Sequence, residues 1–174
     1  KIIPDKKGQP CCRILGAEGE KRMVRLLTWI PGRLWSSVNP VLGELRFDLG
    51  RSLGSITDAL RSFSHPAAHR KLDWDIANGS WTKKYLDLFT IEQRRVLNHF
   101  LQLFEKQKQG YSELRKAVVH NDSNDNNIIV SEDLINPKIK AVIDFGDSVY
   151  TQIINDLAIA CAYAIMDCPD PLEA

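Results

Sequence analysis

The sequence predicts an α+β fold in which a β-hairpin precedes a mainly helical region, and three observations support this class. Two runs of β-compatible residues, 12–15 and 23–28, flank a glycine-punctuated turn, which is typical of a hairpin. Apolar residues then recur at steps of three and four within 42–63 and 96–104, as on one face of an amphipathic helix. Toward the end of the chain, short apolar runs alternate with dense polar loops, where scaffolds commonly place reactive groups.

A Trp-Ile-Pro-Gly segment at residues 29–32 is the expected boundary between the hairpin and the helical region, because proline fixes φ and glycine permits a sharp change of direction. The predicted regions are therefore 1–30 and 31–174. The first long helix is expected to begin at Asn39 and Pro40, with asparagine as the N-cap and proline at the first helical position. Its expected buried face consists of Leu42, Leu45, Leu49, Leu53, Ile56, Leu60 and Phe63.

A second long helix is predicted by the capping-box pattern of Thr90 and Gln93 and is expected to end near Gly110. Its expected buried stripe consists of Val96, Leu97, Phe100, Leu101, Leu103 and Phe104. Between the two helices, residues 64–80 lose the helical periodicity and predict a polar, aromatic loop with a short helical turn. An apolar stretch at residues 153–166 predicts a third helix.

Composition excludes several classes of function. The chain has 174 residues, enough for one domain with a hydrophobic core, and a formal net charge of +1. Such a small charge creates no global field for nucleic acid or for an anionic membrane. The longest apolar run, residues 157–166, is too short for a bilayer, which needs about 20 residues. The four cysteines lack zinc-ligand spacing and favour reduced thiols, so a cytoplasmic protein with neither nucleic-acid nor membrane partners is expected.

Two polar clusters follow short extended runs in the last third of the chain. The first, at residues 120–127, reads His-Asn-Asp-Ser-Asn-Asp-Asn-Asn and lies between extended runs at 117–119 and 127–130. The second, at residues 143–148, reads Ile-Asp-Phe-Gly-Asp-Ser and overlaps the end of a run at 140–143. Phosphoryl transfer needs a base that orients the attacking hydroxyl and a magnesium ion held by oxygen ligands. The carboxylates and amides of the two clusters suit that chemistry.

The pattern His-x-Asp-x-x-x-x-Asn followed by Ile-Asp-Phe-Gly resembles the catalytic and metal-binding loops of the aminoglycoside phosphotransferase and choline kinase superfamily, which has a protein-kinase-like fold. The resemblance implies that Asp122 is the catalytic base and that Asn127 and Asp144 hold Mg²⁺. It also implies ATP or GTP as the phosphoryl donor. The segment Asn-Asp-Leu-Ala resembles a family segment in which an aspartate, here Asp156, anchors the loop structurally.

The resemblance extends to the hinge and to the loop between the long helices. Residues 25–32 resemble the family's hinge strand and linker, which implies that Thr28, Trp29 and Ile30 meet the adenine or guanine ring. The loop at 65–74 is similar to that of hydroxylysine kinase-like phosphotransferases, whose bacterial relatives often occur fused to a class III aminotransferase. The implied acceptor is a hydroxyl group of a small amine or amino acid such as 5-hydroxylysine. Fusion to, or association with, such an aminotransferase is a corresponding expectation.

The sequence departs from the family pattern in three ways. Asn121 stands where the family usually has glycine, so a left-handed backbone, which asparagine tolerates, is expected there. Neither a glycine-rich phosphate loop nor a strand lysine precedes the hinge. The chain also stops soon after its last predicted helix. We therefore expect a fragment with residues 1–30 as the rim of the small lobe and 31–174 as a truncated large lobe. This fragment is expected to bind nucleotide poorly or not at all.

Other interpretations compete at single residues. Asp122, Asn127 and Asp144 are residue types that turns favour, which explains any one of them but not both spacings together. His120 is expected to brace its loop rather than to act as a base. Asp147 is expected either to assist the metal site or to cap the following helix, and the two interpretations are balanced.

Three residues are weaker candidates for the acceptor pocket. They are Asp147, Trp74 and Arg70, of which Trp74 could equally be a packing residue and Arg70 a member of a surface ion pair. The competing functions are an aminoglycoside, choline or homoserine kinase, or a catalytically silent kinase-like module that regulates an aminotransferase. The intact Asp-Asn-Asp set favours an enzyme over the silent module.

Overall fold

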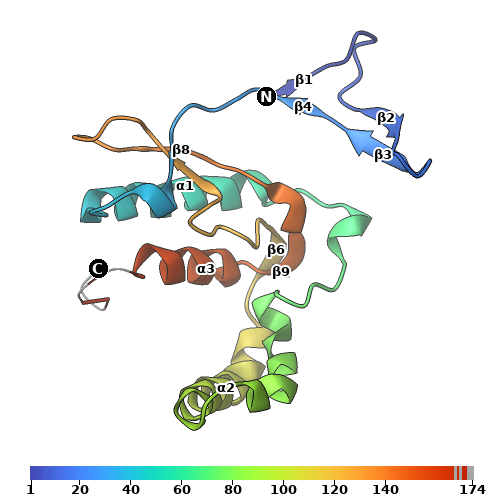
Figure 1. Cartoon of the computed structure of the whole chain (residues 1–174). Coiled ribbons are helices and arrows are strands. Elements are labelled where there is room, and N and C mark those ends of the chain that lie inside the picture. Colours follow the sequence, from blue (N-terminus) through green and yellow to red (C-terminus); the bar gives the residue numbers. More distant parts are fainter. Residues whose placement is uncertain (167, 169, 172–174) are drawn as a thin grey trace. The chain divides into compact units, whose positions relative to one another are not determined.

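A computed structural model describes residues 1–166, 168, 170 and 171 of the chain (Figure 1). It divides into two compact units, Lys1–Pro31 and Gly32–Ala174. The first unit consists of strands and turns, whereas the second contains the helices of the described chain. The assignment of these units as the two lobes of a larger molecule stays a prediction.

The first unit confirms the predicted hairpin and adds a second strand pair. Strand β2 (Cys12–Leu15) pairs antiparallel with β3 (Lys21–Val24), with Cys12 opposite Val24. Strand β1 (Ile2–Ile3) pairs with β4 (Leu26–Leu27). The predicted second strand of the hairpin therefore starts two residues early and is interrupted at Arg25, which separates β3 from β4.

Helix α1 (Gly43–Leu60) carries the main apolar face of the second unit. Leu45, Leu49 and Leu53 are buried, as their spacing predicts. The expected start at Asn39 and Pro40 is wrong, because Leu42, with φ −80° and ψ 152°, is still extended and serves as the N-cap of α1. A short helical turn, η1 (Trp35–Ser37), precedes this extended segment. Leu42 and Phe63 consequently lie outside the helix and are exposed.

The segment that follows contains more helix than its sequence predicts. Turn η2 (Pro66–Ala68) confirms the short helical turn, but η3 (Ile76–Leu88), a run of 3₁₀ turns, was not expected. Helix α2 (Ile91–Ser112) begins with the predicted capping box, in which the Thr90 hydroxyl and the Gln93 side chain accept reciprocal backbone hydrogen bonds.

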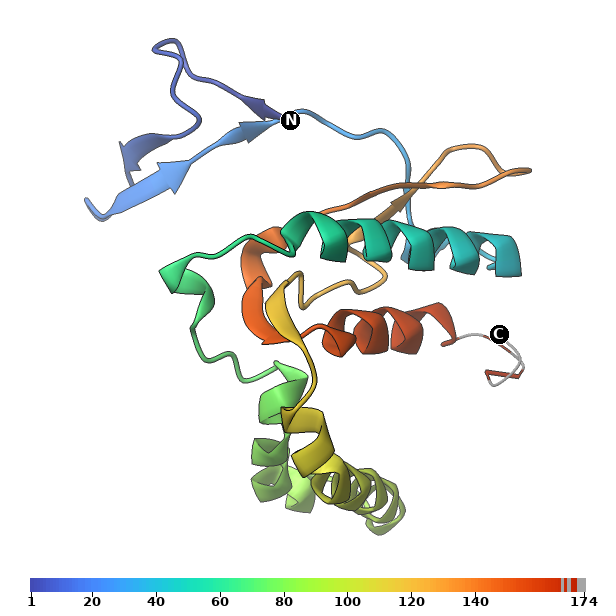
Figure 2. The same cartoon turned by 180° about the vertical axis from the view of Figure 1, so that it is seen from behind.

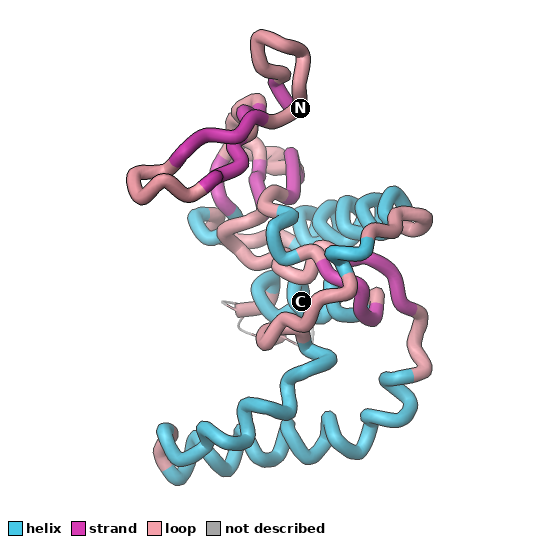
Figure 3. Tube along the Cα trace, turned by 90° about the vertical axis from the view of Figure 1, so that its right-hand side faces the viewer, coloured by secondary structure: helices cyan, strands magenta, loops and turns pink. Residues whose placement is uncertain are grey.

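The predicted buried stripe of α2 is wrong. None of its residues is buried, and Val96 and Phe100 are 56% and 62% exposed. The helix packs against η3, and the tube in Figure 3 shows these two elements extending away from the strands of the second unit. Gly110 does not end α2 but lies within its last turn.

Two small antiparallel sheets carry the polar clusters. One has the strand order β5 (Arg33–Leu34), β7 (Ile128–Val130), β8 (Ile139–Val142). The other pairs β6 (Lys116–Val119) with β9 (Val149–Gln152), of which β9 was not predicted. Helix α3 (Ile154–Ala164) follows β9 and contacts α1, and both views of the ribbon place the two helices side by side (Figure 2). The core between these elements consists of Trp35, Val38, Leu45, Leu49, Leu53, Ile128, Val130 and Ala160.

A buried carboxylate fixes β8 to α1. Asp48 accepts hydrogen bonds from the Arg51 guanidinium at 2.6 Å and from the Ile139 backbone N–H at 2.8 Å. The hydrogen bond from Arg51, followed by that from Ile139, lowers the pKa of Asp48 below its usual value. Because β8 leads directly into Asp144, this contact helps to position the second polar cluster. Among the described residues, no helix has the length and apolar character needed to cross a membrane.

Candidate active site

The first loop, residues 120–127, connects β6 to β7 and holds Asp122 between two amide side chains. The Asn124 Nδ2 donates to Asp122 Oδ1 at 2.8 Å, and the Asn127 Nδ2 donates to Asp122 Oδ2 at 2.7 Å. Asn127 also donates to the Asp122 carbonyl oxygen at 2.9 Å. The structure therefore brings the predicted pair Asp122 and Asn127 into contact and fixes the direction in which the carboxylate points.

His120 braces this loop through both ring nitrogens. Its Nδ1 accepts from the Asp122 backbone N–H at 3.2 Å, which leaves Nε2 to donate to the Ile143 carbonyl oxygen at 2.8 Å. The side chain is fully buried. Because neither nitrogen is free for a substrate proton, the predicted bracing role of His120 is confirmed.

Asp156 anchors the start of the first loop from α3. Its carboxylate oxygens accept the backbone N–H groups of His120 at 2.9 Å and Asn121 at 2.7 Å. Burial raises the pKa of Asp156, and the two backbone hydrogen bonds oppose that rise. The predicted anchoring role of Asp156 is confirmed.

Asn121 has the left-handed backbone expected where the family usually has glycine, with φ at 66°. Its side chain is only 2% exposed, and both amide atoms lack a hydrogen-bond partner. The neighbouring Ser123 is fully buried, and its hydroxyl also lacks a partner. The start of the first loop is thus tightly enclosed at His120, Asn121 and Ser123, whereas Asp122, Asn124, Asp125 and Asn127 are partly exposed.

The second loop, residues 144–148, is built differently. Asp144 has φ at 62°, and its Oδ1 accepts the Gly146 backbone N–H at 3.1 Å, so that it caps the short turn η4 (Phe145–Asp147). A Cβ at Gly146 would lie 2.9 Å from Asp144 Oδ1, so a side chain there would displace the carboxylate. The Asp144 side chain is exposed.

Hydrogen bonds join the two loops. The Ile143 backbone N–H donates to the Asn127 carbonyl oxygen at 2.8 Å, and the Ile143 carbonyl oxygen accepts from His120. The ring of Phe145 lies edge-on to that of His120, with centroids 4.6 Å apart. These contacts attach the residues on both sides of Asp144 to the loop that contains Asp122 and Asn127.

The oxygen atoms left over suit a hard cation. Asn127 uses its Nδ2 as a donor, and its Oδ1 has no partner within the described chain; the same holds for Oδ2 of Asp144. Among the described residues there is no group of three or more His, Cys, Asp or Glu side chains that could hold a metal. One carboxylate and one amide oxygen fit Mg²⁺, which commonly keeps water and substrate phosphates as its other ligands.

The weaker candidates have different surroundings. Arg70 donates through Nη2 to the carbonyl oxygens of Gly146 and, at 3.2 Å, Ser148, and it forms no ion pair. Asp147 cannot cap a following helix, because the next element is the strand β9. Trp74 is exposed. The roles of Arg70, Asp147 and Trp74 in binding an acceptor stay predictions.

The hinge candidates belong to the first unit. Within it, Thr28 donates its backbone N–H to the Lys1 carbonyl oxygen at 2.9 Å and accepts the amino group of Lys1 through its hydroxyl oxygen at 2.7 Å. Trp29 is 88% exposed, whereas Ile30 is partly buried. Contact of these residues with a purine ring stays a prediction.

Sequence reasoning missed two polar residues that support the site. Asn124 lies in the first polar cluster, so the cluster itself was the available signal, but no role was assigned to it. Asp75 is buried and accepts from Thr151 at 3.2 Å and from Asn155 at 3.0 Å. Asn155 precedes the anchor Asp156. Asp75 also accepts the Ala77 backbone N–H as the N-cap of η3, which is a local contact, but its bonds to Thr151 and Asn155 join segments more than 70 residues apart and have no local signal.

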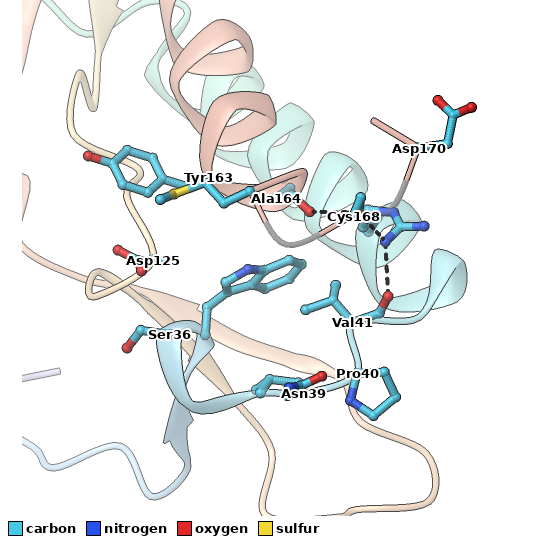
Figure 4. A pocket seen from close by; sticks show the side chains of 13 residues that line it. Ser36, Asn39, Pro40, Val41, Asp125, Tyr163, Ala164, Cys168 and Asp170 are labelled. Atoms are coloured by element: carbon cyan, nitrogen blue, oxygen red, sulfur yellow. Dashed lines mark hydrogen bonds between the residues drawn. The ribbon is translucent and has the colours of Figure 1, made fainter. Parts of the chain in front are cut away.

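A cavity of about 350 Å³ adjoins the outer side of the first loop (Figure 4). Asp125 from the loop and Trp35 from η1 line it. On the opposite wall, Arg46 donates to the Val41 carbonyl oxygen at 2.9 Å and to Cys168 Sγ at 3.4 Å. Asp122, Asn127 and Asp144 do not line this cavity, so it is not part of the candidate active site.

Comparison with protein-family models gives a match over residues 5–174 to the phosphotransferase enzyme family. The chain belongs to this family. Membership places the two loops, the His120 brace and the Asp156 anchor in the context of a phosphotransferase and confirms the resemblance drawn from the sequence.

Curated relatives and solved structures agree with the family. The chain is 28% identical over 169 residues to the hydroxylysine kinase of Bos taurus and 29% identical over 173 residues to that of Xenopus laevis. It is 91% covered in both matches but spans only 45% and 46% of these relatives, about half their length.

Two solved structures show the same fold. A microcompartment-associated aminopropanol kinase superposes with a TM-score of 0.66 at 18% identity, covering 97% of this chain and 53% of that one. The GDP complex of an aminoglycoside 2′-phosphotransferase gives a TM-score of 0.61 at 14% identity, and the match covers 90% of this chain and 53% of that one. The predicted kinase-like α+β fold of this phosphotransferase family is thereby confirmed.

Proposed function

We propose that the protein transfers the γ-phosphoryl group of ATP or GTP to a hydroxyl group of a small amine or amino acid. One observation carries the proposal: hydrogen bonds join the Asp122–Asn127 pair to the loop that bears Asp144, in a member of the phosphotransferase family. Phosphoryl transfer depends mainly on positioning and charge stabilisation, and a braced carboxylate beside free oxygen ligands offers both.

Asp122 is the proposed base. Its two carboxylate oxygens are fixed by Asn124 and Asn127, and its side chain is partly exposed, so an acceptor hydroxyl can approach it. The proton of that hydroxyl passes to the carboxylate as the oxygen attacks the phosphoryl group. His120 is excluded from this role because both of its nitrogens hold the loop.

Asn127 and Asp144 are the proposed Mg²⁺ ligands. When bound, the ion neutralises charge on the phosphate oxygens. Asp122 contributes to this arrangement indirectly, because it fixes the Asn127 Nδ2 and thereby directs the amide oxygen. Thr28, Trp29 and Ile30 are the proposed contacts of the purine ring. The GDP bound to an aminoglycoside 2′-phosphotransferase supports a nucleotide as donor.

The proposed acceptor is 5-hydroxylysine or a similar amino alcohol. The names of the relatives support this class, since they include hydroxylysine kinases and an aminopropanol kinase. An aminoglycoside is the second candidate, supported by the aminoglycoside 2′-phosphotransferase structure. Asp147, Trp74 and Arg70 are the proposed acceptor contacts. We also propose a cytoplasmic location and an association with a class III aminotransferase.

The test is turnover of hydroxylated amines by the intact protein, measured as ADP or GDP release that depends on the acceptor. Asp122→Ala should lower kcat by about 10²- to 10⁴-fold, as expected for loss of a general base. Asp144→Ala should abolish Mg²⁺-dependent turnover. Asp125→Ala is the matched control, because Asp125 lies in the same loop and bonds through its carboxylate to Asn126 alone, so near-normal turnover is expected.

Near-normal rates in both the Asp122 and the Asp144 variants would contradict the proposed roles. Nucleotide binding that requires Mg²⁺, without turnover of any hydroxylated amine, would instead identify a silent kinase-like module.

A further inference from the structure

A second cavity, of about 400 Å³, lies away from the two loops. Its walls come from the segment between η2 and η3, the end of α2, and the paired strands β6 and β9, which the ribbon shows as neighbours (Figure 1). Its volume is in the range of small-molecule sites. Neither Asp122, Asn127 nor Asp144 lines it.

The cavity runs along β9 of the β6–β9 ladder, because Tyr150, Thr151 and Gln152 all line it. Lys116 and Gln152, which are paired, line it, whereas Val119 and Val149 pair at the end that leads into the loop. Lys116 lies three residue steps, or about 10 Å, from that end, whereas Tyr150 is next to Val149. The cavity therefore reaches from the Lys116–Gln152 end toward the candidate active site, but Asp122, Asn127 and Asp144 are not part of its walls.

Positively charged side chains gather around this cavity, and most of them form no ion pair with a described residue. Arg70, Lys71, Lys108 and Lys116 line it, and among the described residues only Lys108 of these four has an ion-pair partner, Glu105 at 3.7 Å. Asp75 is the cavity's carboxylate, but it is buried and accepts three hydrogen bonds through one oxygen. The whole chain carries a net charge of only +1, so this concentration of cations is local. Such a cavity favours an anion.

We propose that this cavity binds a phosphomonoester of a small molecule. Lys71, Lys116 and Arg70 supply the cations for the phosphate group, which accepts several charge-assisted hydrogen bonds. The remaining volume exceeds what a bare phosphate fills, and its walls add the polar side chains of Asn78 and Gln152.

The same walls connect to both loops of the candidate active site. Arg70 donates to the carbonyl oxygens of Gly146 and Ser148 in the second loop. Asp75 accepts from Asn155, the neighbour of the residue that anchors the first loop. A phosphate that draws the Arg70 guanidinium toward the cavity alters the bonds that hold the second loop. This coupling rests on the proposed function, whereas the binding site does not.

Binding is measured by titration calorimetry of the intact protein without nucleotide or Mg²⁺, using phosphoethanolamine and inorganic phosphate as probes. Phosphoethanolamine should bind more tightly than inorganic phosphate. The double variant Lys71→Gln/Lys116→Gln should lose about tenfold or more in affinity, because each lysine contributes a charge-assisted hydrogen bond. The control Lys106→Gln/Lys140→Gln removes two exposed lysines outside the cavity and should bind as the parent does.

The coupling is read from backbone amide shifts in NMR spectra during the same titration. Shifts at Lys71 and Lys116 should be accompanied by shifts at Gly146 and Ser148. Unchanged affinity in the Lys71/Lys116 variant, or equal affinity for the two probes, would overturn the proposal. Loss of turnover in Asp122→Ala with intact phosphoethanolamine binding is expected, so failure of the proposed function and failure of this site are separate results.

Discussion

The two loops of the candidate site both contain a residue with a left-handed backbone, but one of these residues is buried and the other is exposed. Each contains one non-glycine residue with a left-handed backbone, Asn121 at φ 66° and Asp144 at φ 62°. In the first loop His120, Asn121 and Ser123 are almost completely buried, whereas Asp144 and its neighbours Phe145 and Gly146 are exposed.

The carboxylates of the two loops are held in different ways. The first loop is fixed by long-range bonds from Asp156 in α3, more than 30 residues away. The second loop is fixed locally, by Asp144 Oδ1 and the Gly146 N–H, with Arg70 bonded to its backbone. In the proposed function, Asp122 as a base must be held in one direction, whereas Asp144 as a metal ligand needs access to its ion. The braced carboxylate of Asp122 and the exposed carboxylate of Asp144 are consistent with these proposed roles.

The largest effect is expected from removal of the long-range anchor. Asp156→Ala leaves two loop N–H groups unpaired in the interior and should lower the free energy of unfolding by about 2–5 kcal/mol. Urea unfolding of the purified protein measures this. Asp144→Ala is the comparison variant and should cost about 1–2 kcal/mol, since it removes one exposed local bond and places alanine at a positive φ. Equal losses in the two variants would contradict the contrast between the loops.

A smaller effect is expected from the left-handed position in the buried loop. Asn121→Gly should be more stable than Asn121→Ala by about 1 kcal/mol, because alanine is strained at a positive φ and glycine is not. Thermal unfolding of both variants gives the difference. Both variants lack the Asn121 amide, so the difference between them measures the free energy of the left-handed backbone alone. A more stable alanine variant would show that the left-handed conformation is absent in solution.

The smallest effect is a dependence of stability on pH. Burial raises the pKa of Asp156 in the folded protein, so the folded state binds a proton more tightly than the unfolded state. This contribution is fully present below pH 3.8, the ordinary value for aspartate, and is lost as the pH rises through the folded value.

Urea unfolding of the parent and of Asp156→Asn between pH 3.5 and 7 checks this dependence, because the variant cannot titrate at that position. The stability of the parent relative to the variant should fall as the pH rises through this window. A relative stability that rises with pH would mean that the two backbone hydrogen bonds outweigh burial.

Much of the site could be predicted because its signals are local in sequence. The spacing of Asp122 and Asn127 brings them together through a single turn, and Asn121 could be assigned a left-handed backbone from its residue type. The capping box of Thr90 and Gln93 was equally local and equally correct. Asp156 was assigned from a four-residue segment that resembles a family pattern.

The incorrect predictions concern features that depend on contacts between segments distant in the sequence. The apolar stripe of α2 has the correct period, yet Val96 and Phe100 are exposed, because periodicity shows that a face is apolar but not that a partner exists. The extended strand β9 was missed, since its four residues become a strand by pairing with β6. For Arg70 the alternative of a surface ion pair is not met among the described residues, because its partners there are carbonyl oxygens 76 and 78 residues away, while its role toward a substrate stays a prediction.

By itself, the sequence determined the residue types at the two loops, the turn that joins Asp122 to Asn127, and the residues able to adopt left-handed backbones. The tertiary structure alone decided which loop is buried, that His120 and Ile143 join the two, and that cations from three segments line one cavity. The reason is physical: dihedral preferences and local hydrogen bonds act between neighbours in the chain, whereas burial and charge clustering depend on which distant segments pack together.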